Sequence, residues 1–270
     1  MTQEERDMLL YKPQNAHNAL SAAEEAEMNA YCEDYKRFLD ASKTERECVA
    51  EGVRQAEAKG FKNLMDVVKN GETLKAGDRV YRAWMNKDIM LFIIGEKPME
   101  CGMNILGAHI DSPRIDIKQN PLYEDEHLAY LDTHYYGGIK KYQWVALPLA
   151  LHGVVVKKDG TTVTLNIGDK PGDPVFYISD LLIHLAADQM GKTAAKVIEG
   201  DSLNIIIGSE PKKDTDKDPV KTAILDILKE QYGIDEEDFI SAELEAVPAG
   251  HARDLGFDRS MIMGYGHDER

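Results

Sequence analysis

The sequence has few cysteines and no long apolar run, and both absences narrow the class of protein. Its 270 residues contain three cysteines, Cys32, Cys48 and Cys101, which are scattered and form no CxxC pair. This usage excludes a disulfide scaffold and a cysteine-based zinc finger, and it fits a reducing, cytoplasmic location. The densest apolar run, residues 89–94, has the length of a strand and is far shorter than the roughly 20 residues of a membrane-spanning helix.

Positive charge is also scarce. Lys and Arg number 32 against 48 Asp and Glu, so the formal net charge is −16. A chain this acidic lacks the basic face that binds a nucleic-acid backbone or an anionic membrane surface. The first six residues lack the basic-then-apolar order of a secretory signal. We therefore expect no nucleic-acid partner and no membrane partner.

Helices are predicted near the start of the chain and again late in it. Ser21 with Glu24, and Ser42 with Glu45, match the capping-box pattern, in which each side chain satisfies a backbone N–H at the helix start. Residues 218–219, Asp-Pro, open a further apolar-periodic helix, because Asp is a good N-cap and Pro suits the first turn. We expect these helices to pack against a core with their apolar side and to expose their charged side to solvent.

The rest of the chain predicts mainly strands. Residues 80–84 and 89–94 flank a turn, and residues 104–108 form a short apolar run that suits a strand buried on both faces. After residue 113 the pattern becomes β-rich, with alternation of period two. The further predicted strands cover residues 114–118, 154–156, 162–167, 202–207, a half-exposed 240–246 and a buried 261–263.

Two positions could carry metal chemistry. His109 and Asp111 follow the predicted strand 104–108, and residues i and i+2 of a strand share a face, so the carboxylate can hold the imidazole of a zinc ligand. Asp268 follows the predicted strand 261–263, and a carboxylate there could bridge two metal ions. From the residues alone, a core or turn histidine and an ordinary polar terminus are the commoner explanations, and they stay open.

The remaining histidines carry weaker signals. His184 lies in an apolar stretch, where a single histidine is usually a hydrogen-bonded member of a core. No spacing pattern assigns a role to the others, which are His17, His127, His134, His152, His251 and His267.

The order of several motifs resembles one known family. Residues 107–113, Gly-Ala-His-Ile-Asp-Ser-Pro, are similar to the GAHxDSP motif of the M18 metalloaminopeptidases, the aspartyl-aminopeptidase and vacuolar-aminopeptidase-I family. Residues 253–270 resemble its bacterial branch, whose strand ends YGxDDR, with Glu269 where this branch usually has Asp. Further matches follow in the family's order at residues 136–138 (YGG), 183–185 (IHL), 199–203 (EGDSL) and 241–250 (SAELEAVPAG).

The resemblance implies an α/β fold in which a zinc-peptidase-like domain is interrupted by an inserted β-rich domain used for oligomer assembly. Residues 1–113 would form the N-terminal part of the catalytic domain, residues 114–252 the inserted domain, and residues 253–270 the return to the catalytic domain. The implied protein is a cytoplasmic homo-oligomer that acts on peptide substrates.

The resemblance also implies roles for single residues. His109 would be a zinc ligand and Asp111 would orient it, while Asp268 would bridge two zinc ions. His184 would reach the active site of a neighbouring subunit and stabilise the tetrahedral intermediate. The implied reaction is hydrolysis of an N-terminal peptide bond by metal-activated water, with a glutamate as general base.

The family's later residues, a Glu-Glu pair, an aspartate and a C-terminal histidine, have no counterpart after Asp268. The Glu-Glu pairs of this chain, at 4–5, 24–25 and 236–237, all precede it. We therefore expect an incomplete catalytic domain and no peptidase activity of these residues alone. Two alternatives stay open. One is a non-catalytic assembly module, whose β-rich block oligomerises by itself or caps a full-length partner. The other is a different metal hydrolase in which unrecognised ligands complete a site with His109 and Asp268.

Overall fold

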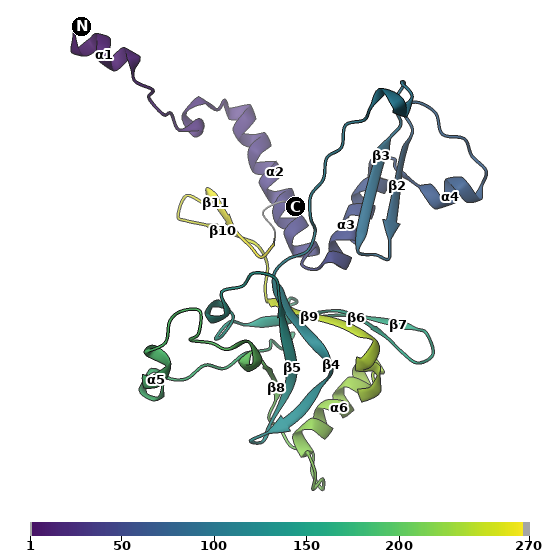
Figure 1. The fold of residues 1–270 in the computed structure, drawn as a ribbon, viewed down its shortest axis with the longest axis vertical. Helices are drawn as coiled ribbons and strands as arrows, with labels where there is room; N and C mark the ends of the chain where they lie inside the picture. The colour runs from purple at the N-terminus through teal and green to yellow at the C-terminus, as the bar shows by residue number, and fades with distance from the viewer. Residues whose placement is uncertain (1, 267–270) are drawn as a thin grey trace.

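The described chain consists of an N-terminal helical part with a small sheet, a six-stranded sheet, and a short C-terminal hairpin (Figure 1). A computed structural model describes residues 2–266. Among residues 2–266, none of the helices combines the length and the hydrophobicity that a membrane span requires. The α-helices are α1 (Gln3–Leu9), α2 (Ala22–Ala41), α3 (Glu45–Ala58), α4 (Leu64–Lys69), α5 (Ala187–Met190) and α6 (Pro219–Tyr232). Short 3-10 helices are η1 (Ala16–Ala19), η2 (Met99–Cys101), η3 (Lys141–Gln143), η4 (Ile183–Leu185), η5 (Gly200–Ser202) and η6 (Glu236–Ser241).

Helices α2 and α3 are joined by a tight, buried turn. The capping box of Ser21 and Glu24 at the start of α2 is confirmed. The predicted cap of α3 at Ser42 is wrong, because Thr44 and Glu47 form that capping box two residues later. Two overlapping patterns of the same spacing occur here. The structure uses the second one because the side chain of Glu45 is directed to an arginine in the large sheet.

The small sheet contains β1 (Lys62–Asn63), β2 (Arg79–Trp84) and β3 (Asp88–Ile93), in the order β1-β2-β3, and confirms the predicted hairpin. The chain then continues in extended form to residue 113. The prediction of a strand buried on both faces over residues 104–108 is wrong, since Leu106 is 101% exposed. A strand needs neighbours that accept its hydrogen bonds, and no described strand pairs with this segment.

The large sheet has six strands in the order β7-β6-β9-β4-β5-β8, and all neighbouring pairs are antiparallel. The predicted hairpin of β6 and β7 is confirmed. The strand predicted from residue 202 begins at residue 205, because residues 200–202 form η5. The strand bounds are β4 (Arg114–Asp125), β5 (Leu128–Tyr136), β6 (Leu149–Val156), β7 (Thr162–Ile167), β8 (Ile205–Gly208) and β9 (Ala242–Pro248).

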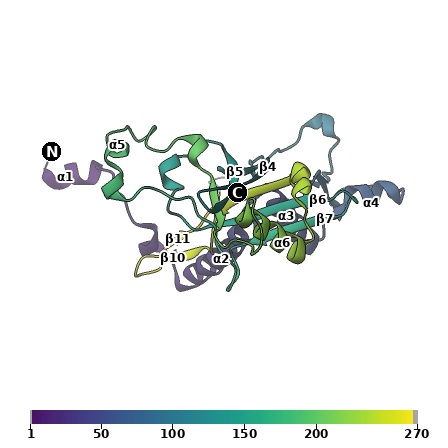
Figure 2. The same ribbon diagram turned by 90° about the horizontal axis from the view of Figure 1, so that it is seen from below.

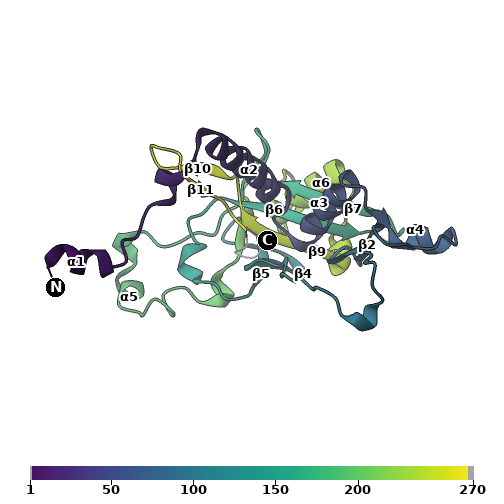
Figure 3. The same cartoon turned by 90° about the horizontal axis from the view of Figure 1, so that it is seen from above.

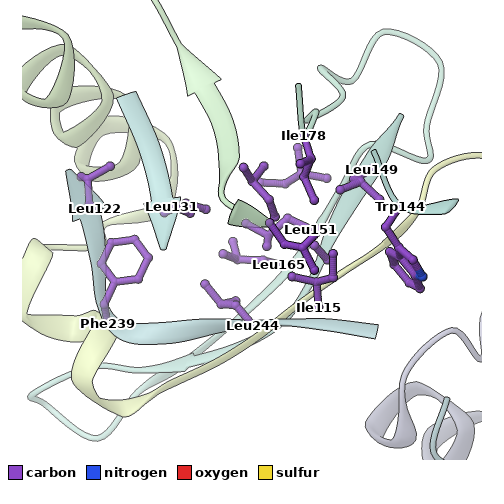
Figure 4. Packing of buried hydrophobic residues seen from close by; sticks show 14 of the residues in the cluster. Ile115, Leu122, Leu131, Trp144, Leu149, Leu151, Leu165, Ile178, Phe239 and Leu244 are labelled. Atoms are coloured by element: carbon purple, nitrogen blue, oxygen red, sulfur yellow. The ribbon is translucent and has the colours of Figure 1, made fainter. Parts of the chain in front are cut away.

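One face of the large sheet carries the hydrophobic core. Leu151, Leu165 and Leu244 lie close together on neighbouring strands, and Phe239 of η6 lies near Leu122 in another part of the same cluster (Figure 4). Helix α6 lies against the sheet on the side away from α2 and α3 (Figures 1 and 2). Its first-turn N–H groups donate to the Glu124 carboxylate of β4 rather than to Asp218, which makes no side-chain cap.

The other face of the large sheet is polar and is also covered. The start of α3 lies over β6 and β9 (Figure 3), so His152 and Glu245 are almost fully buried beneath it. The prediction that residues 240–246 form a half-exposed strand is therefore wrong. The period of two is kept within β9, where residues 244–247 are buried on both faces, whereas residues 240–241 lie in η6 and Ile240 is 56% exposed.

The described chain ends in a two-stranded hairpin of β10 (Arg253–Leu255) and β11 (Met261–Met263). The strand predicted over residues 261–263 is present, but the prediction that it is buried is wrong, because Met263 is 64% exposed. Its only described sheet neighbour is β10.

Candidate functional site

The extended segment over residues 107–113 reaches the large sheet where β4 begins. The turn after β5 packs directly on it, because a side chain at Gly137 would lie 3.4 Å from the Cα of Pro113. Gly137 also has a φ of 77°, a conformation that glycine adopts at little cost. The segment with the predicted metal ligand therefore lies against the C-terminal end of β5.

His109 and Asp111 lie side by side, as their spacing predicts. Nδ1 of His109 is 3.1 Å from the backbone oxygen of Asp111 and 3.2 Å from its Oδ1. Both neighbours are acceptors, so Nδ1 carries the proton and donates it. In that tautomer Nε2 has the lone pair that a zinc ion needs.

The second carboxylate oxygen of Asp111 is also engaged. The hydroxyl of Tyr136, the last residue of β5, donates to Oδ2 of Asp111 at 2.9 Å. Burial works to raise the pKa of Asp111, but hydrogen bonds from Tyr136 and from backbone, together with nearby His109, leave that pKa below its usual value. The same hydrogen bond raises the pKa of the Tyr136 hydroxyl.

Arg114 lies under the ring of Tyr136, with its guanidinium carbon 4.1 Å from the ring centre. It is buried, and it pairs with Glu45 at 2.9 Å, with Asp116 at 2.7 Å and with Glu245 at 3.3 Å. Burial disfavours its charge, but the three carboxyl groups outweigh that effect and raise the pKa of Arg114. This arginine joins α3, β4 and β9 directly below the candidate site.

The carboxyl groups around Arg114 do not all ionise together. Burial and the adjacent charge of Glu45 raise the pKa of Glu245 to about 8. A protonated Glu245 removes the repulsion between two buried carboxylates that face one arginine. Sequence patterns give no sign of this cluster, because Glu45, Arg114 and Glu245 lie on distant segments.

The C-terminal end of the described chain returns to the same place. The Tyr265 hydroxyl donates to the carbonyl oxygen of Pro113 at 2.9 Å, and its ring meets Trp144 edge to face. The other predicted metal ligand, Asp268, lies outside the described residues. Within residues 2–266, no group of three or more His, Cys, Asp or Glu side chains is arranged to hold a metal ion.

His184 lies in η4, on a long irregular segment that protrudes from the large sheet. The expectation of a core histidine is wrong, because Leu182 and Leu185 beside it are 71% and 70% exposed. Among the described contacts, none joins His184 to His109 or Asp111.

His152, which sequence patterns left without a role, lies at the centre of a second buried polar cluster. Its Nδ1 is 2.8 Å from Oε1 of Glu47, and its Nε2 is 3.0 Å from Oδ2 of Asp169. Burial works to lower the pKa of His152, but the two carboxylates outweigh it and raise that pKa. Lys43 completes the cluster through Asp169. His152 is therefore a structural histidine that joins α3 to the large sheet.

Comparison with known proteins identifies the family. The family model described as aminopeptidase I zinc metalloprotease (M18) matches residues 38–270. The chain belongs to the M18 family. This family is one of zinc metalloproteases, and the match includes residues 107–113 and 136–138.

Two curated relatives and two solved structures show how much of the chain the family covers. A probable M18 family aminopeptidase 1 of Clostridium acetobutylicum is 57% identical over 97% of this chain and 57% of its own length. The corresponding protein of Thermotoga maritima is 45% identical over 90% of this chain and 52% of its own. This chain thus spans about half the length of these relatives.

The solved structures confirm the mixed α/β fold. The crystal structure of the M18 aminopeptidase from Thermotoga maritima superposes with a TM-score of 0.86 at 42% identity, over 94% of this chain and 54% of that one. The crystal structure of aminopeptidase I from Clostridium acetobutylicum gives 0.85 at 55% identity, over 96% and 57%.

Proposed function

We propose that the protein containing this chain is a zinc-dependent aminopeptidase that hydrolyses the N-terminal peptide bond of peptides in the cytoplasm. The observation that carries the proposal is the pairing of His109 with Asp111. The carboxylate holds Nδ1 and so leaves Nε2 as the nitrogen that would bind a metal ion. A zinc ion at such a site acidifies its bound water and polarises the substrate carbonyl.

The other site residues enter the proposal through the family resemblance. Asp268 would bridge two zinc ions. Tyr265, three residues earlier in the sequence, is hydrogen-bonded to Pro113. His184 would stabilise the tetrahedral intermediate in a neighbouring subunit. Its exposed position on a protruding segment supports this role, because a side chain that serves another subunit must reach beyond its own.

The division into domains is part of the same proposal. Residues 114–252 contain the whole six-stranded sheet with its core, and residues 1–113 and 253–266 lie outside that sheet. We assign the first part to an inserted assembly domain and the other two to the catalytic domain, with the homo-oligomer formed through the inserted domain.

The test uses the product of the complete reading frame that contains these 270 residues. Purified with zinc, it should release N-terminal residues from unblocked peptides and leave N-acetylated peptides intact, and a chelator should stop the reaction. The variant His109→Ala should lower kcat/KM by at least about 10³-fold, since a zinc ligand is lost. Hydrolysis that survives both the chelator and this substitution would refute the proposal. Residues 1–270 alone should show no such activity.

A second candidate function is a non-catalytic assembly module. It is favoured by the large sheet, which has its own hydrophobic core, and by the exposed apolar side chains around His184. Light scattering of the purified 270-residue chain tests this alternative. A single monomeric mass at all concentrations would argue against it.

A further inference from the structure

Each oxygen of the Asp111 carboxylate contacts a different side chain, one from its own segment and one from β5. Oδ1 faces Nδ1 of His109 at 3.2 Å, and Oδ2 accepts the Tyr136 hydroxyl at 2.9 Å. Two hydrogen bonds on the two oxygens fix both the direction and the rotation of a carboxylate, whereas one bond leaves it free to turn about χ2. Without the hydrogen bond from Tyr136, the Asp111 carboxylate could rotate away from the histidine.

The ring of Tyr136 is itself held in place. The guanidinium of Arg114 lies 4.1 Å from the ring centre, and the contact between a cation and a ring face is attractive. Arg114 is buried and fixed by Glu45 and Asp116, so the ring rests on a rigid support. Next to Tyr136, the close packing of Gly137 on Pro113 keeps the end of β5 against the segment that carries Asp111.

We propose that Tyr136 is a positioning residue of the metal site, which acts through Asp111 to hold the proton of His109 on Nδ1. The chain of contacts runs from Arg114 to the Tyr136 ring, from its hydroxyl to Oδ2 of Asp111, and from Oδ1 to the imidazole. The inference rests on the proposed function only in that His109 is a metal ligand. Its geometric core, a tyrosine that sets a histidine tautomer, stands by itself.

Tyr136 belongs to the large sheet, whereas Asp111 belongs to the extended segment that precedes this sheet. Tyr136 is the last residue of β5 and is paired in register with Arg114, the first residue of the neighbouring strand β4. A residue of the proposed assembly domain thus sets the orientation of a ligand in the proposed catalytic domain. A shift of β5 against β4 would be transmitted to the histidine through a single hydroxyl group.

The test measures the tautomer of His109 in the metal-free 270-residue chain by the ¹⁵N shifts of its ring, at about pH 8.5, where an ordinary imidazole is neutral. The signals are assigned by their loss in His109→Gln. In Tyr136→Phe the ring still stacks on Arg114 but the hydroxyl is gone. We expect the ratio of the Nδ1–H to the Nε2–H form to fall about twofold to tenfold, the net contribution of one hydrogen bond, because the backbone oxygen of Asp111 still accepts from Nδ1.

Two further variants separate positioning from a general structural effect. Tyr130→Phe removes another hydroxyl from the same strand, from a ring stacked on Tyr123, and should leave the ratio unchanged. In the background of Asp111→Asn, adding Tyr136→Phe should have no further effect, because the tyrosine acts only through the carboxylate.

An unchanged ratio in Tyr136→Phe, or an equal fall with and without Asp111→Asn, would overturn the proposal. The readout needs neither zinc nor substrate, so its outcome is independent of the peptidase assay. A shifted tautomer in a protein without zinc-dependent hydrolysis would refute the proposed function and leave the role of Tyr136 intact. Active enzyme with an unshifted tautomer would do the reverse.

Discussion

Lys43 and Asp169 form a buried ion pair, with Nζ 2.7 Å from Oδ1, although 126 residues separate them in the chain. The lysine belongs to the turn between α2 and α3, and it also donates to the carbonyl oxygens of Pro248 and Gly250. Asp169 also forms an ion pair with His152, and the interactions with His152 and Lys43 outweigh its burial and hold its pKa far below the usual value. This cluster fixes the helical part to the large sheet.

Removal of one member of this pair should destabilise the protein strongly. In Asp169→Ala the ammonium group of Lys43 stays buried without its counter-charge, and we expect a loss of about 3–5 kcal/mol in the free energy of unfolding, measured by urea titration. The control is Glu237→Gln, which breaks the exposed pair of Glu237 with Lys158 and should leave the unfolding midpoint unchanged. Equal effects of the two substitutions would contradict the importance of the buried cluster.

Stability should depend on pH through Glu245. Its pKa of about 8 in the folded protein lies above the ordinary value of 4.5, so the folded state holds a proton that the unfolded state releases. The resulting stabilisation is complete below about pH 4.5 and is lost as the pH rises through about 8. The slope between these values is at most one proton, about 1.4 kcal/mol per pH unit.

The variant Glu245→Gln isolates this contribution, because its side chain stays neutral. The difference in unfolding free energy between the native sequence and the variant should shift in favour of the variant from pH 5 to pH 8, as measured by denaturant titration at each pH. A difference that is constant over this range would show that Glu245 ionises at an ordinary pH.

Gly153 should tolerate no side chain. It has a φ of 137°, and a Cβ there would lie 2.0 Å from the carbonyl oxygen of Glu243 on the neighbouring strand β9. Gly153→Ala should therefore cost about 2–5 kcal/mol, because strand separation and backbone strain add. Gly138→Ala is the matched control, since nothing lies within 4 Å of a Cβ there. Thermal unfolding of both variants decides the point, and similar melting temperatures would contradict the close approach of β6 and β9.

The apolar residues around His184 should contribute to self-association. Leu182 is 71% exposed, and burial of such a side chain in an interface stabilises by about 1.5–3 kcal/mol. Leu182→Glu should raise the concentration at which oligomers form by about tenfold or more, measured by light scattering. Leu10→Glu changes an equally apolar side chain, 64% exposed, in the N-terminal segment and should have no effect. Loss of association in both variants would argue for non-specific contacts.

Sequence patterns predicted the elements whose causes are local. The hairpins of β2 with β3 and of β6 with β7 follow from turn residues and alternation, and the end of α6 follows from Gly233 in the left-handed conformation. The side chains of His109 and Asp111 likewise lie together, because only one residue separates the two in the chain.

The features that sequence patterns missed are those made by distant segments. Glu245 alternates as a solvent-facing strand residue would, and only the presence of α3 above it makes it buried. The apolar residues of 104–108 match a buried strand, but burial requires covering elements that the described chain does not place there. The Tyr136 hydroxyl reaches Asp111 across 25 residues, and no local spacing predicts such a contact.

The anchoring of Lys43 to the carbonyl of Gly250 has a consequence for biosynthesis. The lysine leaves the ribosome 207 residues before its last acceptor does, which corresponds to about 10–40 s at the usual rates of translation. Until then, Lys43 in the turn between α2 and α3 lacks the carbonyl acceptors that it contacts in the folded protein. Helices α2 and α3 are thus made early, but this anchor to the large sheet can form only after β9 has been synthesised.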